Sequence, residues 1–167
     1  MEIIHNLNSF SSTQRTSLTI GNFDGFHKGH QLVVDKIIEC SKKKLDHSVL
    51  ISFNPHPLKV LNPNDAPILI TPLEDKITLL RKTSLNTLVL LKFDKDLSRI
   101  SPETFVKDIL VKRFNVRDLF IGNNFSFGYQ RSGNLTLLQK LSKRFLPKNV
   151  ITILLGKGKF RKQHYLR

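Results

Sequence analysis

The sequence has few of the residues that stabilise secreted or disulfide-linked small domains. One cysteine, Cys40, occurs among 167 residues, so no internal disulfide can form. Cys40 falls in a stretch with helical periodicity, where a small buried hydrophobe is its expected role, and we assign it no catalytic one. Acidic residues are also scarce, with 13 Asp and Glu against 27 Lys and Arg and a net charge of +14. This surplus favours polyanionic ligands such as nucleotides.

Long apolar runs are absent as well. No run approaches the roughly 20 residues that a membrane-spanning helix needs, and the N-terminus lacks the regions of a secretory signal. We therefore expect a soluble, cytoplasmic protein with no membrane partner. Lysines occur in nearly every predicted helix, and most of them, including Lys44 and Lys76, are expected to face solvent. Because no arginine stripe interleaves with aromatic residues, no specific nucleic-acid partner is expected.

Apolar segments of strand length alternate with amphipathic segments of helix length along the chain. This alternation is typical of successive βαβ units and predicts a single α/β domain over residues 1–155, with a parallel sheet of about five strands and flanking helices. The expected strands cover residues 17–20, 48–53, 87–92, 118–121 and 150–155.

Four helices are expected between these strands. One runs over about 30–44, and a second runs to Arg81, with Thr71 as its N-cap. Ser101 is expected to cap a third, which turns Phe105, Ile109 and Phe114 inward, and Asn134 to cap a fourth over 135–145.

The segment GNFDGFHKGH, residues 21–30, follows the first expected strand and opens the first expected helix. Its three glycines allow a sharp turn and a close approach of the backbone to a ligand, and the helix N-terminus that follows favours phosphate. His27 and His30 can both point at a triphosphate and stabilise the charge that grows during transfer. A zinc-binding pair is the alternative, but the helical zinc motif spaces its histidines four apart with a glutamate between them.

Two further segments follow expected strands and lack periodicity. Asn54-Pro55-His56-Pro57 holds one histidine between two prolines, as either a site or an ordinary rigid loop. Residues 122–128, GNNFSFG, combine amides and aromatic rings that could bind a planar ring system or pack in the core. Arg131 could reach a phosphate or face solvent.

As a set, GNFDGFHKGH, FNPHP, TPLEDK, SPETFV and GNNFSFG followed by Arg-Ser-Gly resemble the adenylyltransferase module of prokaryotic bifunctional riboflavin kinase/FMN adenylyltransferases, also called FAD synthetases. The resemblance covers roughly residues 14–155. It implies a Rossmann-like nucleotidyltransferase fold and the reaction of ATP with FMN to give FAD and pyrophosphate, with Mg²⁺. The alternatives are another adenylyl- or cytidylyltransferase of this type, and a non-catalytic protein that binds nucleotide.

The resemblance also implies roles for individual residues. His27, His30 and Asn124 are expected to be catalytic, with Asn124 near the metal and the flavin phosphate. ATP and its phosphates are assigned to Gly21, Asn22, Phe23, Asp24, Gly29 and Arg131. FMN is assigned to Asn54, His56, Pro57, Phe125 and Phe127.

Residues 156–167 depart from the resemblance. Similar proteins follow their fifth strand with a Ser-Ser-Thr-x-x-Arg-like segment that contacts the ATP phosphates, and this chain instead reads GKGKFRKQHYLR, a basic tail with little apolar pattern. The chain ends where a riboflavin kinase domain would begin, so riboflavin phosphorylation is not expected. One hypothesis is a shifted reading frame, because the codons for residues 161–165 can spell Val-Ser-Ser-Thr one base forward. Sequencing the gene tests it.

Overall fold

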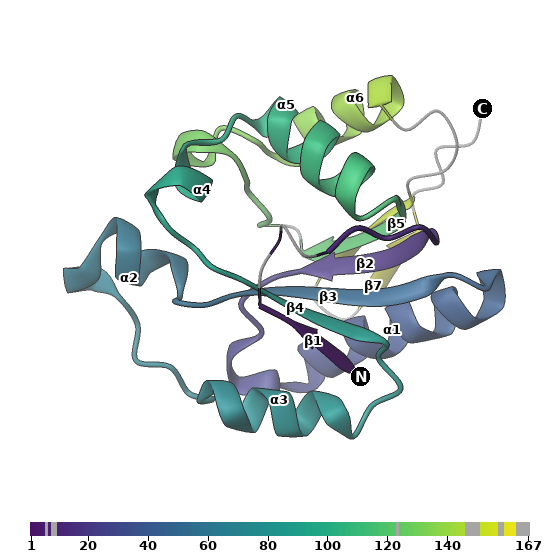
Figure 1. Cartoon of the computed structure of the whole chain (residues 1–167), viewed down its shortest axis with the longest axis horizontal. Coiled ribbons are helices and arrows are strands. Elements are labelled where there is room, and N and C mark those ends of the chain that lie inside the picture. The colour runs from purple at the N-terminus through teal and green to yellow at the C-terminus, as the bar shows by residue number, and fades with distance from the viewer. Residues whose placement is uncertain (6, 8–9, 123, 146–150, 157–158, 163–167) are drawn as a thin grey trace.

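A computed structural model describes residues 1–5, 7, 10–122, 124–145, 151–156 and 159–162, the last two ranges by their backbone alone. Its centre is a sheet with the strand order β1-β4-β3-β2-β5-β6-β7, in which only β7 runs antiparallel to its neighbour (Figure 1). The strands are β1 (Glu2–Ile4), β2 (Thr16–Ile20), β3 (His47–Phe53), β4 (Thr87–Leu91), β5 (Val116–Gly122), β6 (Ile151–Gly156) and β7 (Lys159–Lys162).

The five predicted strands are confirmed as β2 to β6, and the predicted α/β fold with them. All residues of β2 and β4 are buried, as expected for parallel strands that are covered on both faces. The predictions did not include β1 or β7, and β7 occupies part of the segment that was expected to lack a pattern. Val150, the expected first residue of β6, and residues 157–158 and 163–167 of the expected tail lie outside the described residues.

Helices cover both faces of the sheet, with α1 and α3 on one side and α5 and α6 on the other (Figure 1). The helices are α1 (Lys28–Lys44), α2 (Pro57–Leu61), α3 (Leu73–Arg81), α4 (Lys95–Arg99), α5 (Pro102–Thr104) and α6 (Leu135–Phe145), and α5 continues directly into a π-helix (Phe105–Arg113). Two buried clusters result. One lies between the sheet and helices α1 and α3 and includes Ile37 and Leu80. The other lies between the sheet and the helices of the opposite face and includes Val106 and Leu138.

Helix starts were predicted with mixed success. The side chain of Ser101 accepts the Thr104 N–H at 3.0 Å, and that of Asn134 accepts the Leu137 N–H at 2.9 Å, so both predicted caps are confirmed. The predicted Thr71 cap is wrong, because the N-cap of α3 is Pro72 and no side chain caps it. The Thr71 N–H instead donates to the carboxylate of Asp24, which holds Thr71 in the preceding loop.

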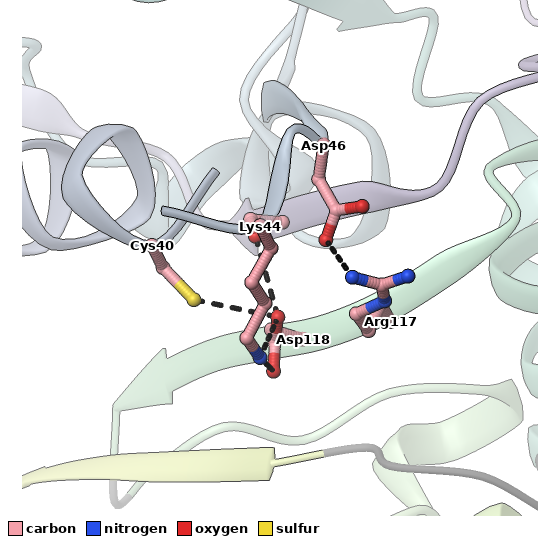
Figure 2. A network of polar contacts seen from close by, with 6 residues as sticks. Cys40, Lys44, Asp46, Arg117 and Asp118 are labelled. Atoms are coloured by element: carbon pink, nitrogen blue, oxygen red, sulfur yellow. Dashed lines mark hydrogen bonds and ion pairs between the residues drawn. The ribbon is translucent and has the colours of Figure 1, made fainter. Parts of the chain in front are cut away.

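A polar network joins α1 to the amino-terminal end of β5 (Figure 2). The carboxylate of Asp118 is fully buried, and the Lys44 ammonium donates to both of its oxygens at 2.7 Å. Oδ2 also accepts from the Cys40 thiol at 3.3 Å and the Ser17 hydroxyl at 3.4 Å. The prediction that Lys44 faces solvent is therefore wrong. Cys40 is half-buried, and burial followed by the Asp118 charge raises the pKa of its thiol, which agrees with a non-catalytic role.

Among the described residues, no helix has the length and apolar character required to cross a membrane.

Candidate active site

Three of the segments singled out in the sequence meet at one edge of the sheet. Residues 21–30 follow β2, residues 54–57 follow β3 and residues 122–133 follow β5, and β2 lies between the other two strands. Because these strands are parallel, their carboxyl ends share an edge. The chain continues from β2 toward β3 and β4 on one side and returns to β5 on the other, so this edge is a topological switch point, where open α/β sheets bind ligands.

The turn after β2 has an unusual backbone that its own side chains stabilise. Phe23, Gly25 and Phe26 have φ values of 50°, 74° and 32°, in the left-handed region that costs a non-glycine residue of order 1–3 kcal/mol. Both phenylalanine rings are buried beside α1 and α3, and this burial offsets the strain.

Asp24 ties this turn to a distant part of the chain. Its carboxylate accepts the N–H groups of Gly25 at 3.0 Å, Ile70 at 3.1 Å and Thr71 at 2.9 Å. Although burial alone would raise the pKa of this carboxyl, the hydrogen bonds from Thr71, Ile70 and Gly25 hold the pKa below its ordinary value. The turn and the loop that leads into α3 therefore form one structure.

His27 caps the helix that follows the turn. Its Nδ1 accepts the N–H groups of Gly29 at 3.1 Å and His30 at 3.4 Å, so in the neutral ring Nε2 carries the proton and remains a donor. A Cβ at position 29 would lie 3.0 Å from Cε1 of His27 and would press on the ring. Glycine at this position therefore allows the imidazole to lie over the first turn of α1.

His30 stacks on His27 from the same helix turn. The ring centroids are 3.8 Å apart with an angle of 21° between the planes, and the ring of Phe23 packs against His30 at 4.9 Å. Burial, assisted by the neighbouring charges of His27 and Lys76, lowers the pKa of His30 from 6.5 to about 4. His30 is thus neutral near pH 7. Its Nδ1 is buried and has no partner among the described residues, as expected of a group that awaits a ligand.

His56 links the loop after β3 to the turn after β2. It caps α2, with Nδ1 accepting the Leu58 N–H at 3.2 Å, and its Nε2 lies 2.7 Å from the side-chain amide of Asn22. Burial lowers the pKa of His56, so the ring is neutral near pH 7. Pro57 supplies the first residue of α2, and the peptide bond between Asn54 and Pro55 is cis.

The amide of Asn22 has one orientation that satisfies this contact. A neutral imidazole has one acceptor nitrogen, and in His56 the Leu58 N–H already occupies it, so Nε2 carries a proton. An amide oxygen facing Nε2 accepts that proton, and the amide NH₂ group then takes the buried position at which no described residue offers a partner. Asn22 thereby gains a free donor at the carboxyl edge of the sheet.

The segment after β5 is divided between the surface and the core. Asn124 is exposed in a turn, and Phe125 is partly buried. Phe127 is 6% exposed and packs on Phe105 at 5.4 Å, so the core-packing alternative describes it better than a ring open to a ligand. Arg131 is exposed and has a positive φ of 57°, as does the neighbouring Gln130 at 52°, so strained backbone occurs in this loop as well as in the turn after β2.

Sequence reasoning missed one functional candidate, Lys76. It was expected at the surface, but it is 6% exposed, and its ammonium donates to the Asn22 carbonyl oxygen at 2.5 Å. The spacing of Leu73, Ile77 and Leu80 could have revealed it, because these residues define the face of α3 that packs on the sheet, and position 76 lies on that face.

Comparison with known proteins agrees with this geometry. The family model for FAD synthetase matches residues 9–154 and so spans all three segments of the site. The chain belongs to the FAD synthetase family. A bifunctional riboflavin kinase/FMN adenylyltransferase of Buchnera aphidicola subsp. Schizaphis graminum is 35% identical over 159 residues, which are 95% of this chain and 50% of that protein. The Escherichia coli K12 protein of the same name is 33% identical over 142 residues, covering 85% and 45% of the two chains.

This FAD synthetase family member spans about half the length of the curated relatives that it matches. Among solved structures, a Streptococcus pneumoniae protein described as a macrolide-efflux protein has a TM-score of 0.74 at 22% identity and covers 95% of this chain and 51% of its own. The Francisella tularensis pantoate-beta-alanine ligase, solved with beta-gamma ATP and beta-alanine, has a TM-score of 0.59 at 19% identity, covering 94% and 68%. These two likenesses support the fold.

Proposed function

We propose that this chain transfers the adenylyl group of ATP to FMN and releases FAD and pyrophosphate, in the cytoplasm. The observation that carries the proposal is the stacked pair of His27 and His30 at the N-terminus of α1, at the switch point of the sheet and inside the match to the FAD synthetase family. A helix N-terminus favours anions, and α1 is 17 residues long, so its first turn suits a triphosphate.

In the proposed reaction a phosphate oxygen of FMN attacks the α-phosphorus of ATP, and the bond to the pyrophosphate oxygen breaks. No covalent intermediate with the protein is required, so the site must position the two phosphates and stabilise charge. His27 can donate from Nε2 without giving up its cap, because Nδ1 holds the helix. The neutral His30 can donate from one nitrogen while the other accepts, and it adds no charge of its own.

We assign the remaining predicted residues by their position at the same edge. Gly21, Asn22, Phe23, Asp24 and Gly29 form the ATP turn, and Arg131 is exposed on the neighbouring loop. We assign Asn54, His56 and Pro57, in the loop after β3, to FMN, together with Phe125, which is less buried than Phe127. These assignments are proposals that mutagenesis can test one residue at a time.

Mg²⁺ fits this site as a companion of ATP. Asn124 offers an exposed amide oxygen, and no group of three or more His, Cys, Asp or Glu side chains suited to a metal occurs in the described ranges. Mg²⁺ commonly retains several waters and binds substrate phosphates with few protein ligands. We therefore propose that the ion arrives with ATP, offsets phosphate charge and contacts the protein through Asn124.

The decisive experiment incubates the purified chain with ATP, Mg²⁺ and FMN and measures FAD and pyrophosphate together. Equal amounts of both products support the proposal. ATP binding without FAD formation supports the non-catalytic nucleotide-binding alternative, and pyrophosphate release with another phosphorylated acceptor in place of FMN supports a different transferase. From Gly156, the last residue of β6, the chain reads GKGKFRKQHYLR in place of the hydroxyl-rich segment. Because one lost donor costs about a hundredfold or more in rate, we expect slow turnover.

A further inference from the structure

Lys76 lies beneath the turn after β2, between the ends of two neighbouring strands. Its ammonium donates to the Asn22 carbonyl at 2.5 Å and to the Ser52 hydroxyl at 3.3 Å. The Ser52 hydroxyl in turn donates to the same Asn22 carbonyl at 3.1 Å. One backbone oxygen of the turn is therefore bonded from α3 and from β3 at once, and this fixes the end of β2 where the site begins.

The buried ammonium of Lys76 lies outside ion-pair distance of any described carboxylate. The charge of Asp24 acts on Lys76 and favours its protonated form, but the oxygens of Asp24 are occupied by three backbone N–H groups. A buried, unpaired ammonium is costly, and a neutral donor could bond the same carbonyl. The charge itself must therefore serve a purpose that the hydrogen bonds do not explain.

The titratable groups around Lys76 indicate what that purpose is. Asp24 lies in the turn, His27 caps α1 and His30 lies in its first turn. His56 caps α2, with Lys59 one turn further. Burial lowers the pKa of Lys76, and Lys76 in turn helps to lower the pKa values of His30 and His56. A positive charge therefore lies beside the imidazoles of His30 and His56, whose pKa values are lowered, and an entering polyanion stabilises this arrangement.

We propose that Lys76 is a positioning residue of the site, which fixes the turn through Asn22 and supplies a buried positive charge to the ligand's phosphates from behind the turn. This proposal rests on the nucleotide binding assumed in the proposed function, but not on transfer to FMN. It predicts that removal of the Lys76 charge weakens ligand binding more as the ligand carries more phosphate charge. Loss of a purely structural hydrogen bond would weaken the binding of ATP, AMP and adenosine equally.

The test compares Lys76→Met with Lys82→Met, which alters an exposed lysine just after the last turn of α3. Calorimetric titrations use ATP, AMP and adenosine at one ionic strength. We expect Lys76→Met to weaken ATP binding by about tenfold to a hundredfold, AMP binding less and adenosine binding hardly at all, as a Coulombic effect requires. Lys82→Met should leave all three affinities unchanged. Equal losses for ATP and adenosine would overturn the proposal.

Two further measurements guard against a variant that folds poorly. Lys76→Gln keeps an N–H donor for the Asn22 carbonyl and should show the same ATP-selective loss. In the unmodified chain, ¹⁵N NMR of the Lys76 Nζ should show its pKa rising when ATP binds and staying constant with adenosine, and a constant pKa in both cases overturns the proposal.

The outcomes also separate the two proposals. If the unmodified chain makes FAD but Lys76→Met binds ATP and adenosine with equally reduced or unchanged affinities, only the proposed role of Lys76 fails. If the chain makes no FAD but the contrast between ATP and adenosine holds, only the transfer activity fails.

Discussion

Two buried charges lie at opposite edges of the same sheet, and their surroundings differ. Asp118, at the amino-terminal end of β5, is bonded by Lys44, Cys40 and Ser17, so both of its oxygens have partners. Lys76, at the carboxyl edge, bonds two neutral oxygens, and no described carboxylate pairs with it. A buried charge that is paired within the protein stabilises the fold, whereas a buried charge without an ion-pair partner is available to a charged ligand.

Backbone strain and unpartnered polar atoms occur at both edges. Non-glycine residues with a positive φ include Phe23, Phe26, Gln130 and Arg131 at the carboxyl edge and Leu45 and Asn115 at the amino edge. Buried side-chain atoms without a hydrogen-bond partner among the described residues belong to Asn22 and His30 at the carboxyl edge and to Asp46 and Arg117 at the amino edge. At the amino edge the ion pair of Asp46 and Arg117, with atoms 3.2 Å apart, adds a second charge pair beside the first (Figure 2). The difference between the two edges therefore lies in how their buried charges are paired.

The largest expected effect is the loss of activity in His30→Gln. Removing a donor that stabilises the transferring charge should slow FAD formation by about a hundredfold to a thousandfold. Steady-state FAD formation measures this, with His5→Gln, which changes an exposed histidine in the β1–β2 connection, as the matched control. A His30→Gln protein as active as the control would remove His30 from the proposed chemistry.

At the opposite edge, Lys44→Met should destabilise the fold and spare the site. It leaves the buried Asp118 carboxylate without its cation, which costs about 3 kcal/mol of unfolding free energy. Urea unfolding measures the loss, and ATP affinity below the unfolding transition should not change. The double variant Lys44→Met/Asp118→Asn should recover part of the stability, because it removes both charges. A weaker affinity for ATP in Lys44→Met would break the division between the edges.

Acid should destabilise the chain partly through His30. Its pKa is about 4 in the folded chain against an ordinary 6.5, so between these values the unfolded chain binds more protons. The resulting contribution to the unfolding free energy is complete above pH 6.5 and is lost as the pH falls toward 4. Partial exposure limits it to about 2 kcal/mol. The loss of stability between neutral and acidic pH should therefore be smaller in His30→Gln than in the unmodified chain, and equal losses would refute a neutral, half-buried His30.

The smallest expected effect is that of Cys40→Ala. The thiol is a weak donor, and Asp118 keeps its bonds to Lys44 and Ser17, so the loss of unfolding free energy should stay below about 1 kcal/mol. FAD formation should not change. A clear loss of activity in this variant would contradict a purely structural role for Cys40.

Apolar patterning predicts the strands β2 to β6 and the inward-facing residues Phe105, Ile109 and Phe114. The runs that became β2 to β5 are covered on both faces, and such burial leaves a continuous apolar signal. The bounds of α6 agree with the predicted 135–145 because its cap and its periodicity point to the same start. In contrast, β1 has three residues, which is too short for a pattern to emerge.

Long-range polar contacts were beyond the reach of sequence patterns. Thr71 resembled a helix cap because its bond to Asp24, 47 residues earlier in the chain, is invisible locally. The helical pattern alone predicts that Lys44 and Lys76 are surface lysines, because Asp118 and the Asn22 carbonyl, to which they donate, lie on other elements. The motif GNFDGFHKGH predicts the turn that holds the two histidines. It does not predict the left-handed backbone of Phe23, because burial of the Phe23 ring in the folded protein offsets the strain of that conformation.

The double anchoring of the segment between β3 and α3 has a practical consequence. His56 fixes its beginning through the Leu58 N–H, and Asp24 fixes its end through Ile70 and Thr71. Between these anchors the chain is largely exposed, and Ile68 is 95% exposed. Insertions are best tolerated where the backbone is exposed and few hydrogen bonds depend on it. A fluorescent label or a short peptide tag introduced near Ile68 would therefore sit close to the turn after β2 without disturbing it, and would report on the binding of the proposed ligands there.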